Sequence, residues 1–140
     1  MSGNLNQLIF LGTGTSTGIP IIGCKCSVCT SRDKKNQRLR SSVYIQAKSG
    51  ESFIIDTGPD LRTQLLRSQV QNLDFAILTH DHADHIHGLD DLRPFTFFPK
   101  KREIPVFCHE VHFQKIKNKF DYIFKRKELF SEKNPYVGGA

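Results

Sequence analysis

The 140-residue sequence lacks any long uninterrupted hydrophobic segment. No stretch approaches the roughly 18 apolar residues that a membrane-spanning helix needs. The opening residues, Met1-Ser2-Gly3-Asn4, are polar and lack the basic start and apolar core of a secretory signal peptide. Repeats and low-complexity tracts are also absent. We therefore expect one domain with a modest core, located in the cytoplasm and without a membrane partner.

The sequence also has few cysteines, and their arrangement does not suggest a disulfide framework. Three of the four lie close together at Cys24, Cys26 and Cys29. This is the spacing of metal ligands, and three thiolates need one more ligand to close a structural zinc site. The candidates for that ligand are Cys108, His109 and His112. The alternative is a set of ordinary free thiols.

A dense cluster of histidine and aspartate is the most informative feature that the sequence does contain. Residues 75–79 are apolar and strand-like, and residues 80–85 then read His-Asp-His-Ala-Asp-His. The cluster should therefore lie where a strand leaves its sheet. Neutral imidazole and carboxylate suit zinc, manganese and iron, and two such ions side by side can promote hydrolysis. A solvated loop without metal is the alternative.

The spacing within the cluster predicts two groups of ligands. His80 and His82 can turn toward one ion if the backbone is extended, and Asp84 and His85 can face a second ion. We expect Asp81 to point outward. His87 lies outside this pattern, and we expect it to be a loop or pocket residue.

Hydrophobic periodicity predicts an α/β (α+β) fold in which helices cover a sheet. The expected strands cover residues 7–11, 42–48, 52–56, 75–79 and 104–108, and the expected helices begin near residues 61, 88 and 111. In the second strand Val43, Ile45 and Ala47 should face inward. In the first helix Leu61, Leu65 and Leu66 should form the apolar face. A helix over residues 88–93 should stop at Pro94, and residues 111–124 should form one amphipathic helix.

Two polar segments at the ends of expected strands need separate interpretation. The glycines of residues 12–18 follow G-x-G-x-x-x-G, which differs from the dinucleotide fingerprint, so we expect no nucleotide cofactor. Asp56 ends a strand just before Thr57-Gly58. It is either a turn residue or a carboxylate that orients the metal-binding histidines from behind.

Positive charge is concentrated near the end of the sequence. The net charge is +6, and from Lys100 onward ten Lys and Arg residues face five Asp and Glu residues. This excess indicates either a solvated helix face or attraction for a phosphorylated substrate or polyanion. We expect a small phosphorylated substrate, and nucleic acid is the less favoured partner.

Two independent motifs resemble the PhnP-type cyclic phosphodiesterases of the metallo-β-lactamase fold. One is Thr79-His80-x-His82-Ala83-Asp84-His85 with residues 88–93, and the other is Thr13–Pro20 with the three cysteines. The resemblance implies that His80 and His82 bind one metal ion and that Asp84 and His85 bind a second. It also implies that Asp84 helps to orient the nucleophile, as a catalytic residue. The cysteines would hold a structural zinc, and an aspartate at the position of Asp56 belongs to the same pattern.

The resemblance further implies that the chain is the N-terminal half of an αββα sandwich. It also implies a hydrolase that uses two zinc ions to cleave a small cyclic phosphodiester, with Mn²⁺ or Fe²⁺ as alternative ions. Related enzymes take further ligands from a C-terminal half, and nothing after His112 can supply them. We therefore interpret residues 1–140 as a truncated metallo-β-lactamase-like domain that is inactive alone and able to form a homodimer. A tRNA-processing nuclease and a non-catalytic metal-binding half-domain are the alternatives. Such nucleases usually have glycine in place of Ala83 and lack the cysteines.

Overall fold

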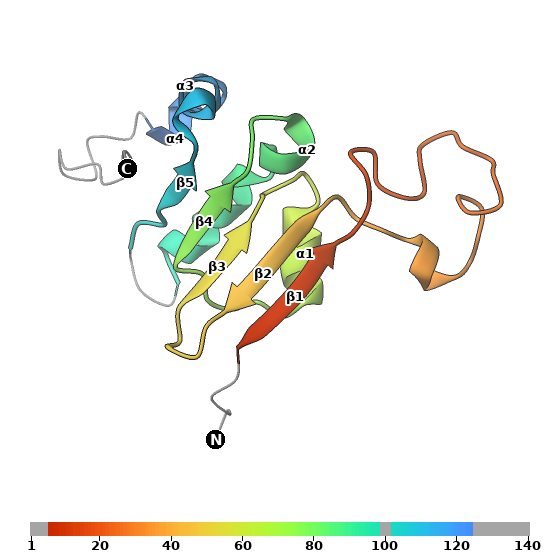
Figure 1. The fold of residues 1–140 in the computed structure, drawn as a ribbon, viewed down its shortest axis with the longest axis horizontal. Coiled ribbons are helices and arrows are strands. Elements are labelled where there is room, and N and C mark those ends of the chain that lie inside the picture. Colours follow the sequence, from red (N-terminus) through yellow and green to blue (C-terminus); the bar gives the residue numbers. More distant parts are fainter. Residues whose placement is uncertain (1–5, 99–101, 125–140) are drawn as a thin grey trace.

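The computed structural model describes residues 6–98 and 102–124, which build a five-stranded mixed sheet (Figure 1). The strands lie in the order β1-β2-β3-β4-β5. Their bounds are Gln7–Gly12, Ser42–Gln46, Ser52–Ile55, Phe75–Leu78 and Val106–Cys108. The first three strands are antiparallel neighbours, whereas β3, β4 and β5 run parallel. The predicted α/β fold class and its five strands are therefore confirmed.

Short helices connect and cover these strands. They are η1 (Lys34–Asn36), α1 (Leu61–Arg67), α2 (Ala83–Ile86), η2 (Leu89–Thr96), α3 (Glu110–Lys119) and α4 (Asp121–Phe124), where η marks 3₁₀ geometry. In the described part of the chain, no helix has the length and hydrophobicity required to cross a membrane.

The core lies between one face of the sheet and these helices. From the sheet it receives Leu11, Tyr44, Ile54, Ala76 and Leu78. From the helices it receives Leu61, Leu65, Ile86, Leu89, Leu92, Phe95, Ile116 and Phe120. Figure 1 shows α1 behind the sheet in this view, so the helical layer and the viewer are on opposite sides of the strands.

The predicted inward face of β2 is wrong. Val43, Ile45 and Ala47 are only partly buried, whereas Ser42 and Tyr44 are buried. Both faces of this strand carry apolar side chains, so period-two alternation could not decide which face meets the helices. Tyr44 fills the core and its hydroxyl donates to the Asn72 carbonyl at 3.2 Å.

The helices also depart from the expected pattern. Leu61 and Leu65 are buried as predicted, but Leu66 is 62% exposed and Gln64 is fully buried instead. The expected stop at Pro94 is wrong, because η2 continues to Thr96. The expected helix over residues 111–124 is divided at Phe120 into α3 and α4.

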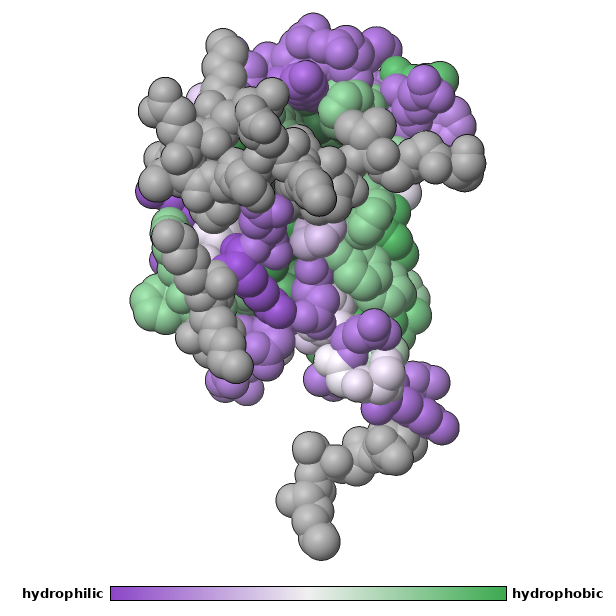
Figure 2. Space-filling view, turned by 90° about the vertical axis from the view of Figure 1, so that its left-hand side faces the viewer, coloured by the Kyte–Doolittle hydropathy of each residue, from purple (hydrophilic) through white to green (hydrophobic). Residues whose placement is uncertain are grey.

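The second face of the sheet is apolar, and its side chains are only partly buried or exposed. It carries Leu8, Phe10, Val43, Ile45, Phe53, Ile55, Phe75, Ile77 and Phe107. The Phe53 and Phe75 rings stack with centroids 4.7 Å apart, and Phe107 meets Phe75 edge-on at 5.6 Å. Figure 2 shows hydrophobic residues along the right-hand side of that view, where this face lies. The αββα sandwich that the resemblance implies would place a second sheet here.

We expect the 140-residue chain by itself to self-associate through this uncovered sheet face, because large exposed apolar surfaces favour association. Phe10 and Phe107 are 66% and 42% exposed, so aspartate at either position leaves the core in place. The variants Phe10→Asp and Phe107→Asp should shift the chain toward monomer in sedimentation analysis. Leu66→Asp, on helix α1, is the matched control and should leave association unchanged. An unaltered chain that stays monomeric at high concentration would contradict this expectation.

Candidate metal centre

The histidine–aspartate cluster begins two residues after the end of β4 and runs into the short helix α2. His80 and His82 lie in the connecting loop, and Asp84 and His85 lie in the first turn of α2. The structure brings these four side chains together as two pairs. His80 Nε2 lies 3.1 Å from His82 Nδ1, and His85 Nε2 lies 3.2 Å from Asp84 Oδ2. The His80 and His85 ring centroids are 4.0 Å apart, so the pairs are adjacent.

The Asp56 carboxylate lies behind both pairs. It is 6% exposed and follows the last residue of β3. Asp56 Oδ2 is 2.7 Å from His85 Nδ1, and Asp56 Oδ1 accepts from the Thr79 backbone N–H at 2.8 Å. With Nδ1 of His85 held by Asp56, its Nε2 faces the Asp84 carboxylate. This is the arrangement in which a carboxylate orients a metal-ligating histidine.

Thr79 extends this orientation to the other pair, and sequence reasoning missed it. Its hydroxyl lies 2.8 Å from Asp56 Oδ2 and 2.9 Å from His80 Nδ1. A threonine hydroxyl has one proton. If it donates that proton to the carboxylate, it accepts from His80 Nδ1–H, which leaves His80 Nε2 free to face His82. The only signal in the sequence is that Thr79 stands directly before His80 at the strand end.

Two glycines allow the loop after β3 to pack tightly against α2. A Cβ atom on Gly58 would lie 2.2 Å from the Asp84 carbonyl oxygen, and one on Gly88 would lie 2.0 Å from the Gly58 carbonyl oxygen. The Thr57 N–H donates to the His85 carbonyl at 2.7 Å, and the Gly88 N–H donates to the Thr57 carbonyl at 2.7 Å. The backbone around Asp56 and the metal helix is thereby held as one unit.

The electrostatic surroundings favour neutral imidazole at His80. Desolvation lowers the pKa of His80, and the neighbouring His85 and His82 lower it further. A histidine must be neutral to bind metal, so a lowered pKa supports the ligating form. The donor types and their hydrogen-bonded partners suit divalent metal ions, although among the described residues these four side chains approach one another as two pairs and not as one group of three or more donors.

The prediction that Asp81 points outward is wrong. Its Oδ1 lies 2.6 Å from His112 Nδ1, and Lys115 Nζ is 3.6 Å from its Oδ2. The hydrogen bond from His112 holds the pKa of the Asp81 carboxyl below its usual value, against the effect of desolvation. Helix α3, which follows β5, brings these partners to the metal loop.

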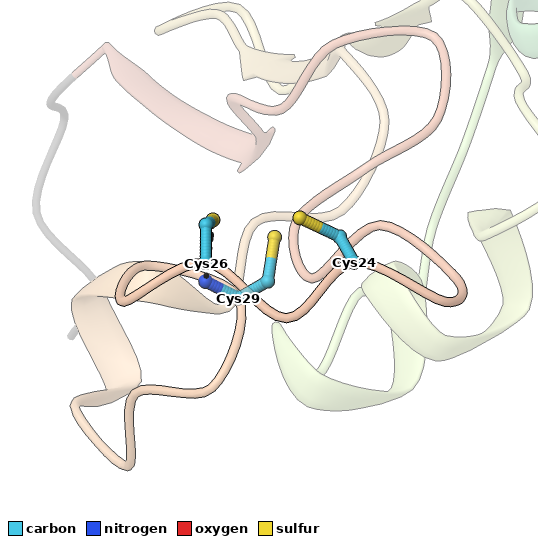
Figure 3. Close-up of side chains that lie close together, drawn as sticks. All are labelled: Cys24, Cys26 and Cys29. Carbon is cyan, nitrogen blue, oxygen red and sulfur yellow. Dashed lines mark hydrogen bonds between the residues drawn. The ribbon is translucent and has the colours of Figure 1, made fainter.

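The three clustered cysteines lie at the end of a long loop. Their sulfur atoms are all within 4.8 Å of one another and turn toward one another in Figure 3. Hydrogen bonding from the Cys29 N–H, followed by contacts with the Cys24 and Cys29 side chains, lowers the pKa of Cys26 to about 7. The three thiols thus suit a metal ion as a donor set.

A fourth ligand for these thiols is not found in residues 6–98 and 102–124. None of the expected candidates, Cys108, His109 and His112, joins the group. Cys108 lies on β5, at the opposite edge of the sheet from β1, which leads into the cysteine loop. These three candidates were suggested by residue type alone, and the sheet topology separates them from the thiols.

The base of the cysteine loop is held by the rest of the fold. Backbone hydrogen bonds join Gly14 to Leu39 at 2.7 Å and Ile19 to Arg38 at 2.8 Å. Asp60 accepts from the Arg40 backbone N–H at 2.8 Å and from its guanidinium at 3.0 Å. Asp60, at the N-cap position of helix α1, makes no side-chain cap and instead ties this loop to the helix.

Comparison with known proteins shows which family shares this arrangement. A family model described as "Beta-lactamase superfamily domain" matches residues 51–136. The chain is 41% identical over 132 residues to "Octanoyltransferase" from Porphyromonas gingivalis, spanning 94% of the chain but 25% of that protein. The crystal structure of a diphosphatase from the PhnP family superimposes with a TM-score of 0.80 and 45% identity, over 85% of this chain and 47% of that one.

More distant structures share the fold alone. Human tRNase Z, short form, superimposes with a TM-score of 0.56 at 24% identity, over 94% of this chain and 42% of that one. Zn²⁺-bound PqqB from Methylobacterium extorquens superimposes with a TM-score of 0.67 at 19% identity, over 81% of this chain and 40% of that one. The chain thus spans less than half the length of these relatives. On the family match, which covers more than half of its residues, the chain belongs to the beta-lactamase superfamily, and it is similar to a PhnP-family structure within it.

Proposed function

We propose that this chain supplies the N-terminal ligands of a dinuclear metal-dependent phosphodiesterase that acts on a small cyclic phosphodiester. The observation that carries this proposal is the division of four side chains into two adjacent pairs, in each of which Asp56 holds one histidine, His85 directly and His80 through Thr79. The similarity to a PhnP-family diphosphatase supports phosphoryl chemistry. A small phosphorylated molecule is the substrate class we propose.

Each side chain has a separate role in the proposed centre. His80 Nε2 and His82 Nδ1 would hold the first ion, and His85 Nε2 with Asp84 would hold the second. We propose zinc, with manganese or iron as alternatives here. When bound, such ions acidify water and offset the negative charge that develops on a phosphoryl group. Asp84 would also orient the attacking water, which makes it the proposed catalytic residue.

The four side chains alone provide two ligands per ion, whereas catalytic zinc typically has three. The chain covers 47% of the PhnP-family structure, so activity is proposed for a longer protein. Within the 140 residues we propose a metal-binding unit that is inactive or nearly so. At the cysteines we propose a structural zinc, and free thiols of this kind suit the reducing cytoplasm.

A tRNA-processing nuclease is the second candidate. Exposed Lys115, Lys117 and Lys119 on α3 would attract RNA. The likeness to human tRNase Z is one of fold, and the cysteine cluster and Ala83 favour the phosphodiesterase. The octanoyltransferase name belongs to a protein of which the chain covers a quarter, and it does not identify the chemistry of this centre.

The first prediction concerns metal content. His82→Ala and Asp84→Ala should each lower the metal retained after dialysis, measured by elemental analysis, because each removes a ligand from one pair. His87→Ala is the matched control. This exposed histidine ends the same short helix as Asp84 and His85 but belongs to neither ligand pair. Unchanged metal content in both ligand variants would exclude this site.

The second prediction concerns turnover. The 140-residue chain should hydrolyse bis-p-nitrophenyl phosphate and a cyclic phosphodiester little or not at all. A chimaera in which it replaces the matching part of the PhnP-family diphosphatase should hydrolyse both. His82→Ala in that chimaera should lower the rate of hydrolysis by more than roughly 100-fold. Loss of a residue that only supports a ligand costs up to that factor, and loss of a ligand itself should cost more.

Structured RNA provides the discriminating substrate for the same chimaera. Cleavage of RNA in preference to the cyclic phosphodiester would favour the nuclease. Turnover by the isolated chain at the rate of the chimaera would refute the argument from incomplete coordination.

The third prediction concerns Cys26. In metal-free protein its alkylation by iodoacetamide should rise with pH around a midpoint of about 7, because the thiolate is the nucleophile and its pKa is lowered to about 7. Bound zinc should protect it, and Cys26→Ser should remove about one zinc per chain and lower the thermal unfolding temperature. Cys108, whose pKa is raised by burial, is the internal control and should react slowly with or without zinc. Rapid alkylation of Cys26 in zinc-loaded protein would contradict a structural zinc.

A further inference from the structure

Helix α3 makes its polar contacts with the metal loop at Asp81. His112 Nδ1 on this helix is 2.6 Å from Asp81 Oδ1, and Lys119 Nζ donates to the Asp81 carbonyl oxygen at 2.9 Å. The side chains of His112 and Asp81 are 24% and 14% exposed, so this contact is largely shielded from water. Both the carboxylate and the peptide group of Asp81 are therefore fixed from the same helix.

Asp81 stands between the two histidines of the first proposed ligand pair. In extended backbone, alternate side chains point to opposite sides, so His80 and His82 share one side and Asp81 takes the other. The backbone at His82 is extended, and the ring nitrogens of the two histidines converge to 3.1 Å. Holding Asp81 from behind therefore sets the direction in which both rings point.

His112 acts on this pair through Asp81. Its ring centroid lies 6.4 Å from that of His80, and its Nδ1 is bonded to the Asp81 carboxylate. No such role follows from the sequence, where His112 lies 31 positions after Asp81. The contact exists because β5 lies beside β4 and leads directly into α3.

We propose that His112 is a positioning residue, which through Asp81 holds His80 and His82 in the orientation that binds the first metal ion. This inference rests on the proposed metal binding by these two histidines. It makes helix α3 a part of the metal centre, although α3 contributes no ligand to the pair. Asp56 and Thr79 orient His80 through its Nδ1, and the α3 contact orients the peptide that joins His80 to His82.

The test is a zinc titration of the ¹⁵N-histidine-labelled 140-residue chain, in which NMR follows each imidazole separately. In His112→Ala, the zinc concentration that shifts the His80 and His82 resonances should rise by about 10-fold or more, the cost expected when a partner behind a ligand is lost. His112→Asn should restore most of the affinity, because its side-chain amide N–H can donate to Asp81 from nearly the position of Nδ1. The rescue separates positioning from simple packing of the imidazole.

Lys119→Ala and Lys117→Ala provide a matched pair that keeps the test valid if His112→Ala does not fold. Both remove one charge from α3, but only Lys119 donates to the Asp81 carbonyl. Lys119→Ala should weaken zinc binding at His80 and His82, and Lys117→Ala should not. Equal affinities in all variants, or no rescue by asparagine, would overturn this inference alone. No zinc-dependent shift of His80 and His82 in the unaltered chain would overturn the proposed function and this inference together.

Discussion

The buried Asp56 carboxylate is the group on which the arrangement of the metal centre depends. It joins the end of β3 to the end of β4 through Thr79 and to α2 through His85. Its backbone has a φ of 64°, and its carbonyl accepts from the Ser42 hydroxyl at 2.8 Å. Hydrogen bonds to a charged group contribute about 1.5–3 kcal/mol each. Loss of this carboxylate would therefore leave Thr79 and His85 without their buried acceptor and release both ligand pairs.

Sheet topology explains why three distant parts of the sequence meet at Asp56. The strands β3, β4 and β5 are parallel neighbours, so their carboxyl ends lie at one edge of the sheet. Ligand sites in open α/β sheets form at this edge. Asp56 follows β3, Thr79 and His80 follow β4, and β5 leads into the helix that carries His112. The metal loop is thus supported from both neighbouring strands, and each support ends on a different part of the loop.

The sequence was sufficient to predict the strands and the position of the cluster, because each depends on local pattern. It was insufficient where two neighbouring residues were equally suited to burial by their local pattern. Val43 and Tyr44 are both suitable for a core, and the helical layer selected Tyr44. Leu66 is exposed and Gln64 buried because the Gln64 amide donates to the Arg40 carbonyl at 2.7 Å, a contact with a distant loop. Asp81 and Thr79 obtained their roles in the same way, from partners that only the folded topology brings near.

The two proposed metal sites differ in how the protein positions their ligands. At the histidine pairs, the rings of His80 and His85 are already hydrogen-bonded through Nδ1, so a metal ion meets side chains whose ordering has been completed by folding. Such preorganisation increases affinity by lowering the entropic cost of binding. The cysteine loop is fixed at its base, whereas the Cys26 side chain near its tip is exposed. The three sulfur atoms already lie within 4.8 Å of one another, and a metal ion bound to them would cross-link this long loop, so binding would add to folding stability. The same chain would therefore use one metal site for chemistry on a rigid support and the other as part of its structure.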